Sequence, residues 1–583
     1  MKRLMQYLAP FKIRMAFGLI IKAVGTVMDL FLPWILSYII DDIIPKENIK
    51  MTVFWGCIMI VCSFIAWSGN IIANRMASRV AGDCTRALRH DLFEKISYLD
   101  ASTVDKLTIS SLESRITSDT YNVHAMVGMI QRLGVRAPIL VIGGLVVSLM
   151  LDARLTLILA LTMPFIALSV FIISGRGVKL YRKLQNAVDD IVSVVRENAT
   201  GVRVIKALCK TEYEKKRFDG VNTKAIDIER QAGTIMSLTN PLITFFLNAG
   251  LCAVIAAGAY WVDGGVSTNG KIVAFMSYFT IISNATISIS RIFTSSSKGI
   301  ACMDRIDKVL CEEPSLWLDE YADNSNFPEE EASASTAVPP HIEFRNVTFA
   351  YDNKKVLDDI SFTINHGETL GIIGATGSGK STIISLLMRM YDVDSGEILI
   401  DGVNIKKIPS KKLRERFGAV FQNDFLFADT IYENVSFGRD LSKDVVDDAL
   451  VKAQASSFVG AYDDKTEHML DIKGANLSGG QKQRLLIARA IAASPEILIL
   501  DDSSSALDYK TDAELRRVIR TSMKNTTSII IAQRISAVMN ADKILVLEGG
   551  CCIGLGKHDE LMEKCDVYRE TAEVQMSGGE VIE

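Results

Sequence analysis

The stretch GIIGATGSGKST, residues 371–382, decides the fold of the C-terminal half of the chain. Within it, residues 374–381 match the phosphate-binding loop G-x-x-x-x-G-K-[ST]. The loop follows an apolar run at 370–373 and precedes a helical pattern at 382–390, so the sequence predicts a strand, a glycine-rich turn and a helix. Glycines let backbone N–H groups close around phosphates, and the helix N-terminus adds partial positive charge.

The loop also supplies candidate ligands for a nucleotide and a metal ion. The ammonium of Lys380 is placed to reach terminal phosphates, and the hydroxyl of Ser381 is a candidate ligand of Mg²⁺. The candidate nucleotide-binding residues of this segment are Gly374, Thr376, Gly377, Ser378, Gly379, Lys380, Ser381 and Thr382.

Two further motifs follow the loop. Residues 477–481 are LSGGQ, and residues 497–502 are ILILDD, an apolar run typical of a buried strand that ends in two carboxylates. The loop, LSGGQ and this strand in this order resemble the ATP-binding cassette (ABC) family, and ENATGVRVIKAL (197–208) and FRNVTFAY (344–351) resemble its exporter branch. The resemblance covers nearly the whole chain. It implies an α-helical membrane domain of six spans, similar to type IV ABC exporters, fused to an α/β cassette that binds ATP and Mg²⁺.

The resemblance also implies roles for individual residues. Tyr351 matches an aromatic residue that stacks on adenine, Gln422 matches a glutamine that contacts Mg²⁺ and the attacking water, and Asp501 matches an aspartate of the Mg²⁺ shell. In this family two cassettes enclose two ATP molecules, each between one loop and the opposite signature. One chain has one cassette, so a second half-transporter subunit is implied. The residues that would contact the partner's ATP are Ser478, Gly479, Gly480 and Gln481.

Two residues depart from the family pattern where hydrolysis would occur. The family places Glu after the strand aspartate as the base that polarises water, and this chain has the shorter Asp502. The family places His near the γ-phosphate, and this chain has Gln533, which can donate a hydrogen bond but cannot become cationic. We therefore expect a catalytic set of Asp502, Gln533 and Gln422 that hydrolyses ATP slowly. Ile472 also replaces a Glu that often precedes the signature, and variation within the family explains this third departure more simply.

An intact signature beside a weakened catalytic set is typical of one subunit of a heterodimeric exporter. The implied partner is a different chain with Glu and His at the two degenerate positions. The alternatives are a homodimer with two slow sites, which could export lipid or peptide, and an ATP-gated regulator or channel without transport. An importer or a soluble cassette ATPase is disfavoured because the apolar segments are fused ahead of the cassette.

The composition indicates a membrane protein. The chain has 583 residues, too many for one compact core, with 49% hydrophobic residues and a mean hydropathy of +0.23. The net charge of -4 argues against nucleic-acid binding. The ten cysteines are scattered without the spacing of a zinc site or disulfide framework, so we expect reduced or buried thiols.

Six apolar stretches are each long enough, at about 20 residues, to cross a bilayer or nearly so. They lie near 15–40, 52–73, 134–151, 154–175, 238–262 and 271–291. The basic, amphipathic segment at 1–15 precedes a run too long for a signal peptide, and we expect an interfacial helix there.

The charges between the spans predict the orientation of the chain. Basic residues gather in the long connections at 74–133 and 176–235, which places them, both termini and the cassette on the cytoplasmic side of the cell membrane. Helical periodicity in both connections predicts helices that continue past the membrane, with two small cytoplasmic domains as the alternative. The resemblance places short contact helices near 103–112 and 201–210, with a tip that docks on the cassette near Gln422.

A change of composition marks the domain boundary. Residues 312–340 are acidic, lack Lys and Arg and end in ASASTAVPP, which is typical of a solvated linker. The predicted domains are a membrane domain at 1–311, this linker at 312–340, a cassette at 341–575 and a tail at 576–583.

The spans say little about the substrate. Lys22 and Asp29 lie seven residues apart on one face of the first span, and charges at that depth are costly. They either face a translocation path, or Lys22 extends to the interface while a neighbouring helix pairs Asp29. The Phe, Met, Ser and Thr side chains of the spans suit an apolar or amphipathic cargo, which could be a drug-like small molecule, a lipid or a peptide.

Overall fold

The computed structural model describes residues 1–583 except 266, 313–338, 352–353, 423–424, 504–505 and 578–583, and the chain divides into two units. The first unit comprises residues 1–97 and 108–312, and the second comprises 98–107 together with the chain from 313 onward. The short segment 98–107, inside the predicted membrane domain, is thus grouped with the cassette. The predicted linker at 312–340 and tail at 576–583 lie almost wholly outside the described residues.

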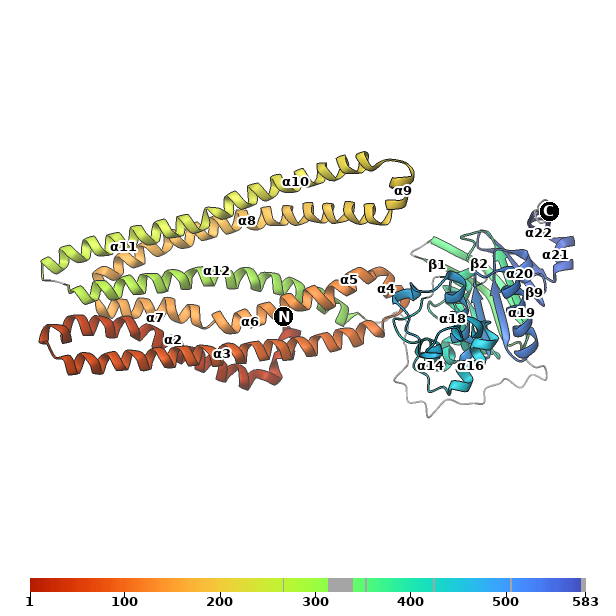
Figure 1. The fold of residues 1–583 in the computed structure, drawn as a ribbon, viewed down its shortest axis with the longest axis horizontal. Coiled ribbons are helices and arrows are strands. Elements are labelled where there is room, and N and C mark those ends of the chain that lie inside the picture. Colours follow the sequence, from red (N-terminus) through yellow and green to blue (C-terminus); the bar gives the residue numbers. More distant parts are fainter. Residues whose placement is uncertain (266, 313–338, 352–353, 423–424, 504–505, 578–583) are drawn as a thin grey trace. The chain divides into compact units, whose positions relative to one another are not determined.

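The first unit is built from helices (Figure 1). Within the described residues, six helical stretches are long and apolar enough to cross a membrane, which confirms the six predicted spans. The helices are α1 (Lys2–Leu8), α2 (Lys12–Tyr38), α3 (Ile49–Ser97), α5 (Ile109–Ser114), α6 (Thr120–Leu133), α7 (Arg136–Leu151), α8 (Ala153–Thr200), α9 (Val202–Ala207), α10 (Thr211–Ser237), α11 (Thr239–Asp263) and α12 (Asn269–Cys311).

Local sequence sets where these helices turn and how far they run. Asp152 ends α7 and begins α8, and its carboxylate accepts hydrogen bonds from the backbone N–H groups of Arg154 and Leu155, as an N-cap does. The helix α3 continues to Ser97 and α8 to Thr200, well beyond the predicted spans. The long connections are therefore helical extensions and not separate small domains.

Buried polar contacts join the helices of the first unit. Lys22 is 2% exposed, and its ammonium donates a hydrogen bond to Asn74 Oδ1 at 3.0 Å. Asp29 forms an ion pair with Arg136 of α7, with 3.2 Å between Oδ2 and Nη2. A neighbouring helix thus pairs Asp29, as the second alternative expects, whereas Lys22 is buried against Asn74 instead of extending outward. That the two residues face a translocation path stays a prediction.

The second unit contains two sheets with helices around them (Figure 1). Its strands are β1 (Ile342–Tyr351), β2 (Lys354–Ile364), β3 (Thr369–Gly374), β4 (Ser395–Ile400), β5 (Val403–Asn404), β6 (Phe417–Val420), β7 (Ile497–Asp501), β8 (Thr527–Ile531), β9 (Lys543–Glu548) and β10 (Cys551–Gly556). Its helices are α4 (Ala101–Leu107), α13 (Lys380–Leu387), α14 (Ser410–Glu415), α15 (Ile431–Ser436), α16 (Lys443–Lys452), α17 (Ser456–Val459), α18 (Gly479–Ala492), α19 (Tyr509–Ser522), α20 (Ile535–Val538), α21 (His558–Lys564) and α22 (Asp566–Ser577).

The larger sheet positions the functional residues. Its strand order is β10-β9-β3-β8-β7-β6, and β9, β3, β8, β7 and β6 are parallel to one another. Every residue of β7 is buried, as expected for a continuous apolar run in a parallel sheet that is covered on both faces. The smaller sheet is antiparallel, in the order β2-β1-β4-β5.

The segment 98–107 lies against the cassette through α4. Asp100 accepts hydrogen bonds from the backbone N–H and the hydroxyl of Thr103, at 3.2 and 2.8 Å, and so caps the start of this helix. On α4, Asp105 Oδ2 accepts a hydrogen bond from the hydroxyl of Tyr391 at 2.6 Å. The predicted contact helix near 103–112 is thus divided at Thr108 into α4 and α5, and α4 contacts the cassette at Tyr391. The second predicted contact helix corresponds to α9, which has no buried residue within its own unit.

Candidate functional site

The phosphate loop has the geometry that its sequence predicts. It leaves β3 at Gly374 and enters α13 at Lys380, so the helix lies at 380–387, slightly earlier than the predicted 382–390. Gly377 and Gly379 have φ of +85° and +99°, in the left-handed region that favours glycine. A Cβ on Gly379 would lie 2.5 Å from Leu357 Cδ2 and 3.2 Å from the backbone oxygen of Val356, and together with the positive φ these contacts favour glycine at this position.

The ammonium group of Lys380 lies close to the loop backbone and to two carboxylates. The ammonium of Lys380 donates hydrogen bonds to the carbonyl oxygens of Gly374 and Ala375 at 2.7 and 2.8 Å. Burial lowers the pKa of Lys380, while the carboxylates of Asp501 and Asp502 act in the opposite direction. Such a partly desolvated cation at the start of α13 suits a polyphosphate.

Asp501 and Ser381 form the candidate metal site. Asp501 ends β7 and is 4% exposed, and it interacts with the Ser381 hydroxyl through a side-chain hydrogen bond. Burial raises the pKa of Asp501, and the hydrogen bond from Ser381 and the charge of Lys380 oppose that rise. A carboxylate next to a hydroxyl is the oxygen donor set that Mg²⁺ prefers, so these residues fit the ion.

The two residues that depart from the expected family pattern, Asp502 and Gln533, meet across adjacent strands. Asp502 follows β7, Gln533 follows β8, and the parallel register pairs Asp501 with Ile531. Gln533 Nε2 donates a hydrogen bond to Asp502 Oδ2 at 3.3 Å. Asp502 has φ of +48°, a left-handed conformation that is uncommon outside glycine and is often found at functional sites.

Gln422 lies further along the same edge of the sheet. It comes just after β6, is exposed, and precedes residues 423–424, which lie outside the described part of the chain. The phosphate loop, Gln533, Asp502 and Gln422 thus follow β3, β8, β7 and β6, four neighbouring strands of one sheet. Ligands of open α/β sheets bind at the carboxyl ends of such strands, which is where the structure brings these predicted residues.

Tyr351 ends β1 in the smaller sheet, within an aromatic cluster. Its ring packs edge-to-face on Phe349 and on Tyr391, with centroid distances of 4.8 and 5.1 Å. Tyr351 is half-buried, so one part of the ring is held by packing while the rest can contact a ligand.

The signature residues form the start of a helix. Ser478 is the N-cap of α18 and makes a capping box with Gln481: Ser478 Oγ accepts from the N–H of Gln481 at 3.3 Å, and the Gln481 side chain accepts from the N–H of Ser478 at 2.9 Å. Ser478 and Gly479 are exposed within the single chain. Their backbone groups and the helix N-terminus are therefore available to an anionic partner.

Two residues near this site were missed by sequence reasoning. Tyr391 follows α13 and carries no motif, although an aromatic residue so close to the loop could have drawn attention. Gln575 lies in the polar C-terminal helix α22, where a glutamine is typical of a solvated surface, and its two backbone contacts depend on the tertiary fold.

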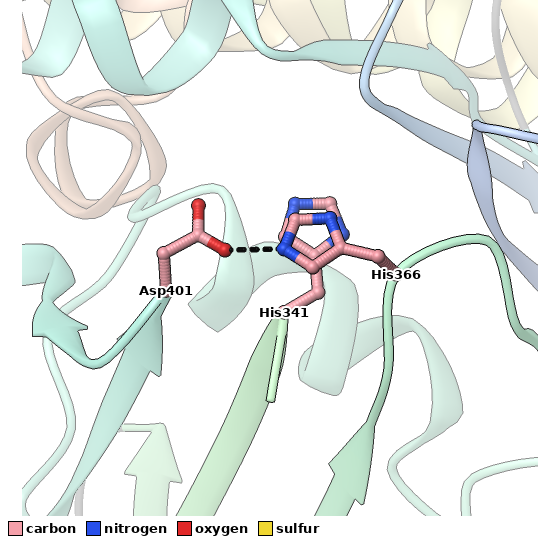
Figure 2. A group of neighbouring side chains, drawn as sticks. All are labelled: His341, His366 and Asp401. Carbon is pink, nitrogen blue, oxygen red and sulfur yellow. Dashed lines mark hydrogen bonds and ion pairs between the residues drawn. The ribbon is translucent and has the colours of Figure 1, made fainter. Parts of the chain in front are cut away.

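A second cluster of titratable groups lies at the ends of β1, β2 and β4 in the smaller sheet, next to the start of β8. His341 and His366 stack with 3.9 Å between ring centroids, and His366 Nε2 lies 2.7 Å from Asp401 Oδ1 (Figure 2). His341 is 1% exposed, and its Nδ1 lies 2.7 Å from Thr527 Oγ1. The guanidinium of Arg416 contacts both Asp401 and His341 Nε2. Because Arg416 already places a cation beside these groups, the geometry fits a structural hydrogen-bond network better than a metal site.

The cysteines form no disulfide in the described chain. Each of the ten cysteines, all of which lie among the described residues, is a free thiol, as predicted. Cys84, Cys302 and Cys565 are buried.

Comparisons with known proteins agree with this architecture. Residues 15–286 match the model of the ABC transporter transmembrane region, and residues 357–505 match the ABC transporter model. The chain is 34% identical to the uncharacterized ABC transporter ATP-binding protein YfiB of Bacillus subtilis, over 99% of this chain and 98% of YfiB. It is 31% identical to a candidate multidrug export ATP-binding/permease protein of the same species, YgaD, over 99% of each.

The fold has a counterpart among solved structures. A bacterial Atm1-family ABC exporter with ATP bound superposes with a TM-score of 0.79 at 24% identity, over 97% of this chain and 99% of that chain. The six-span membrane fold joined to an α/β nucleotide-binding fold is thereby confirmed.

Proposed function

This chain belongs to the ABC transporter family as an exporter subunit that couples ATP hydrolysis to transport. From that premise we propose that it works in a heterodimer, as the subunit whose own ATP site hydrolyses slowly. Its cargo is an apolar or amphipathic small molecule, lipid or peptide. The observation that carries the proposal is the contact of Gln533 with Asp502 beside an intact signature at 478–481.

The chemistry of the Asp502–Gln533 pair supports slow hydrolysis. An aspartate withdraws its carboxylate by about one C–C bond, roughly 1.5 Å, compared with a glutamate. A general base has to lie within about 2.6–3.2 Å of the proton it removes, and it typically contributes about 10²–10⁴-fold to the rate. Oδ2 of Asp502 accepts a hydrogen bond from Gln533, so the short carboxylate and the uncharged amide are held together as one pair beside the phosphate loop.

Binding of ATP does not depend on that pair. The loop amides, Lys380 and the ring of Tyr351 would hold the phosphates and adenine, while Ser381, Asp501 and Gln422 would hold Mg²⁺. Bound Mg²⁺ would neutralise phosphate charge and orient the terminal phosphate. This chain's residues then hold the nucleotide in place without a well-placed base.

The signature supports a role at a second site. The exposed N-terminus of α18 offers backbone donors and the helix dipole to the γ-phosphate of ATP held by another cassette. The proposed partner is a different half-transporter with Glu and His at the positions of Asp502 and Gln533. A homodimer with two slow sites is the second candidate. The capping box of Ser478 forms within this chain, so the signature could face the cassette of an identical copy as well as that of a different partner.

Charge and apolar content support the remaining parts of the proposal. Basic residues in the connections at 74–133 and 176–235 favour a cytoplasmic cassette and cytoplasmic termini in the cell membrane. The exposed apolar side chains of the spans indicate contact with membrane lipid.

The experiment that tests the proposal begins with affinity purification of the chain from its native membrane. We expect a second half-transporter with Glu and His at the two positions to copurify. ATP-dependent flux of a hydrophobic dye into inverted vesicles that contain both chains then separates an exporter from an ATP-gated regulator. Recovery of the chain only with copies of itself, at full ATPase activity, would contradict the heterodimer.

A further inference from the structure

A side chain from the last helix of the cassette anchors the backbone beside the nucleotide site. Gln575 of α22 donates a hydrogen bond from Nε2 to the carbonyl oxygen of Gln533 at 3.0 Å. Its Oε1 accepts a hydrogen bond from the N–H of Ile535 at 2.8 Å. One amide group thus spans the two-residue interval in which the chain passes from β8 into α20.

The contact with Ile535 satisfies a group that the fold leaves without an intrahelical partner. Ile535 is the first residue of α20, and the first N–H groups of a helix cannot bond within it. The N-cap residue, Arg534, makes no side-chain cap. Gln575 therefore acts as a cap supplied from another helix, and it fixes the direction in which the backbone leaves Gln533.

Helix α22 is itself firmly docked. Tyr568 and Ala572 are 1% and 0% exposed and pack in one buried cluster with Ile373, Ala532 and Ile535. Ile373 directly precedes the phosphate loop, and Ala532 directly precedes Gln533. The same hydrophobic cluster therefore joins α22 to the residue before the phosphate loop and to the residue before Gln533.

The side chain of Gln533 has little packing of its own. It is exposed and borders a cavity of about 310 Å³ that is also lined by Thr376 of the loop and by Tyr568 and Thr571 of α22. Because open space surrounds the side chain on that side, its position depends on how its backbone is held. Gln575 holds the backbone carbonyl of the same residue whose side chain contacts Asp502.

We propose that Gln575 is a positioning residue, which acts from α22 to hold residue 533 in register with Asp502 and the γ-phosphate of bound ATP. The proposal rests on the proposed function, because it assigns residue 533 to the hydrolysis step. Gln575 contacts backbone atoms of Gln533 and Ile535 and not the nucleotide. It therefore affects the rate of the chemical step and leaves ATP affinity unchanged.

The test uses the full chain with its copurifying partner, in a background carrying Asp502→Glu so that this chain's own site contributes to turnover. Gln575→Leu removes both hydrogen bonds at similar volume, and Gln575→Glu keeps only the acceptor for Ile535. Val574→Ala is the matched control, because Val574 is the preceding residue on α22 and is 72% exposed. The readouts are kcat, the KM for ATP, and hydrogen exchange of the Ile535 amide.

We expect Gln575→Leu to lower kcat about tenfold relative to the background, as small displacements of catalytic groups do, with KM unchanged. The Ile535 amide should exchange faster in Gln575→Leu, and Gln575→Glu should retain its protection but lose kcat. Val574→Ala should change nothing. Unchanged exchange in Gln575→Leu, faster exchange with unchanged kcat, or a raised KM with unchanged kcat would each overturn the proposal.

Failure of the proposed function would look different. If Asp502→Glu gives no gain in turnover and Gln533→Ala has no effect, the assignment of the Asp502–Gln533 pair is wrong. The Gln575 proposal then falls with it, whatever the exchange of Ile535 shows. If Gln533→Ala lowers kcat while Gln575→Leu does not, only the Gln575 proposal is wrong.

Discussion

Gln533 Nε2 and Asp502 Oδ2 lie 3.3 Å apart, joined by a hydrogen bond between the ends of the parallel strands β8 and β7. The register of the two strands fixes this contact, because Asp501 pairs with Ile531. Both members of the pair depart from the family pattern expected from the sequence, and each contacts the other. Because Asp502 lies at this position, a longer side chain there, as in Asp502→Glu, is expected to change the rate of ATP hydrolysis.

Asp502→Glu should raise ATP hydrolysis at this chain's own site. The added methylene group moves the carboxylate forward by about 1.5 Å, toward the position from which a base can reach water. We expect an increase of about tenfold or more in single-turnover hydrolysis, measured with the chain in excess over ATP. Asp502→Asn is the control and should give no increase. Equal rates for native chain and Asp502→Glu would contradict the assignment of Asp502 as a short base.

Lys380→Ala should abolish nucleotide binding at this chain's own site. The substitution removes the charge that the loop presents to the phosphates, together with its contacts to Gly374 and Ala375. Photo-crosslinking of an azido-ATP analogue to this chain measures the effect. Lys524→Ala, which changes an exposed lysine of the same unit, should label normally. Undiminished labelling of Lys380→Ala would refute the site.

Tyr391→Phe should loosen α4 from the cassette without affecting ATP binding. Burial and the carboxylate of Asp105 raise the pKa of Tyr391, so its hydroxyl remains a donor at neutral pH. Loss of this hydrogen bond to a charged group costs about 1.5–3 kcal/mol. Faster hydrogen exchange in residues 98–107 measures the effect, and Tyr351→Phe, which keeps the aromatic cluster, is the control. Unchanged exchange would show that α4 is held by other contacts.

The contact between Asp105 and Tyr391 refines the coupling path expected from the sequence. That path docks a contact helix near Gln422, and the structure gives α4 a contact at Tyr391, whose ring packs on Tyr351. Cysteine pairs at positions 105 and 391 and at 105 and 422 test the two contact points. Efficient crosslinking of only the first pair is the expected result, and crosslinking of only the second would favour the contact near Gln422.

His341 should make the cassette less stable at acidic pH. Burial lowers the pKa of His341, Asp401 opposes that effect, and His366 and Arg416 add to it. A histidine whose pKa is lower in the folded than in the unfolded state contributes stability above about pH 6.5 that is lost as the pH falls through this value. The charged and titratable groups around it are His366, Asp401, Arg416 and Glu496.

The pH effect is measured as the thermal unfolding midpoint of the cassette between about pH 8 and about pH 5.5. The midpoint should fall with pH in the native chain, and it should fall less in His341→Gln, which cannot take up a proton. His468→Gln is the control, since His468 interacts with Asp464 away from this network. Equal falls in the native chain and His341→Gln would contradict the prediction.

The parts of this protein predicted from the sequence are those set by local pattern. The lengths of the apolar stretches predicted the six spans. The loop 374–381, the signature and the strand that ends at Asp501 predicted the nucleotide-binding fold. Helix α13 was placed slightly late because Lys380, at the end of the glycine run, already has helical geometry. These features depend on neighbours in the sequence, and so they could be predicted.

The parts that could not be predicted depend on contacts between distant residues. Nothing near Asp29 in the sequence points to Arg136, which lies 107 residues away, and nothing near Tyr391 points to Asp105. The contacts of Gln575 with Gln533 and Ile535 join segments about 40 residues apart through a docked helix. Such pairs follow from tertiary packing, which a single sequence does not specify by pattern.

The central claim is that this chain's own ATP site is slow and that its signature serves a competent site on a different partner. The most direct measurement is steady-state ATP hydrolysis by the chain alone and with its copurifying partner, for the native chain, Asp502→Ala, Ser478→Ala and Gly480→Asp. The account predicts low activity alone, a modest loss for Asp502→Ala, and a loss of about 10²–10³-fold for the signature variants, which remove transition-state contacts at the partner's site. Full activity of the chain alone, with Asp502→Ala as damaging as Gly480→Asp, would contradict it.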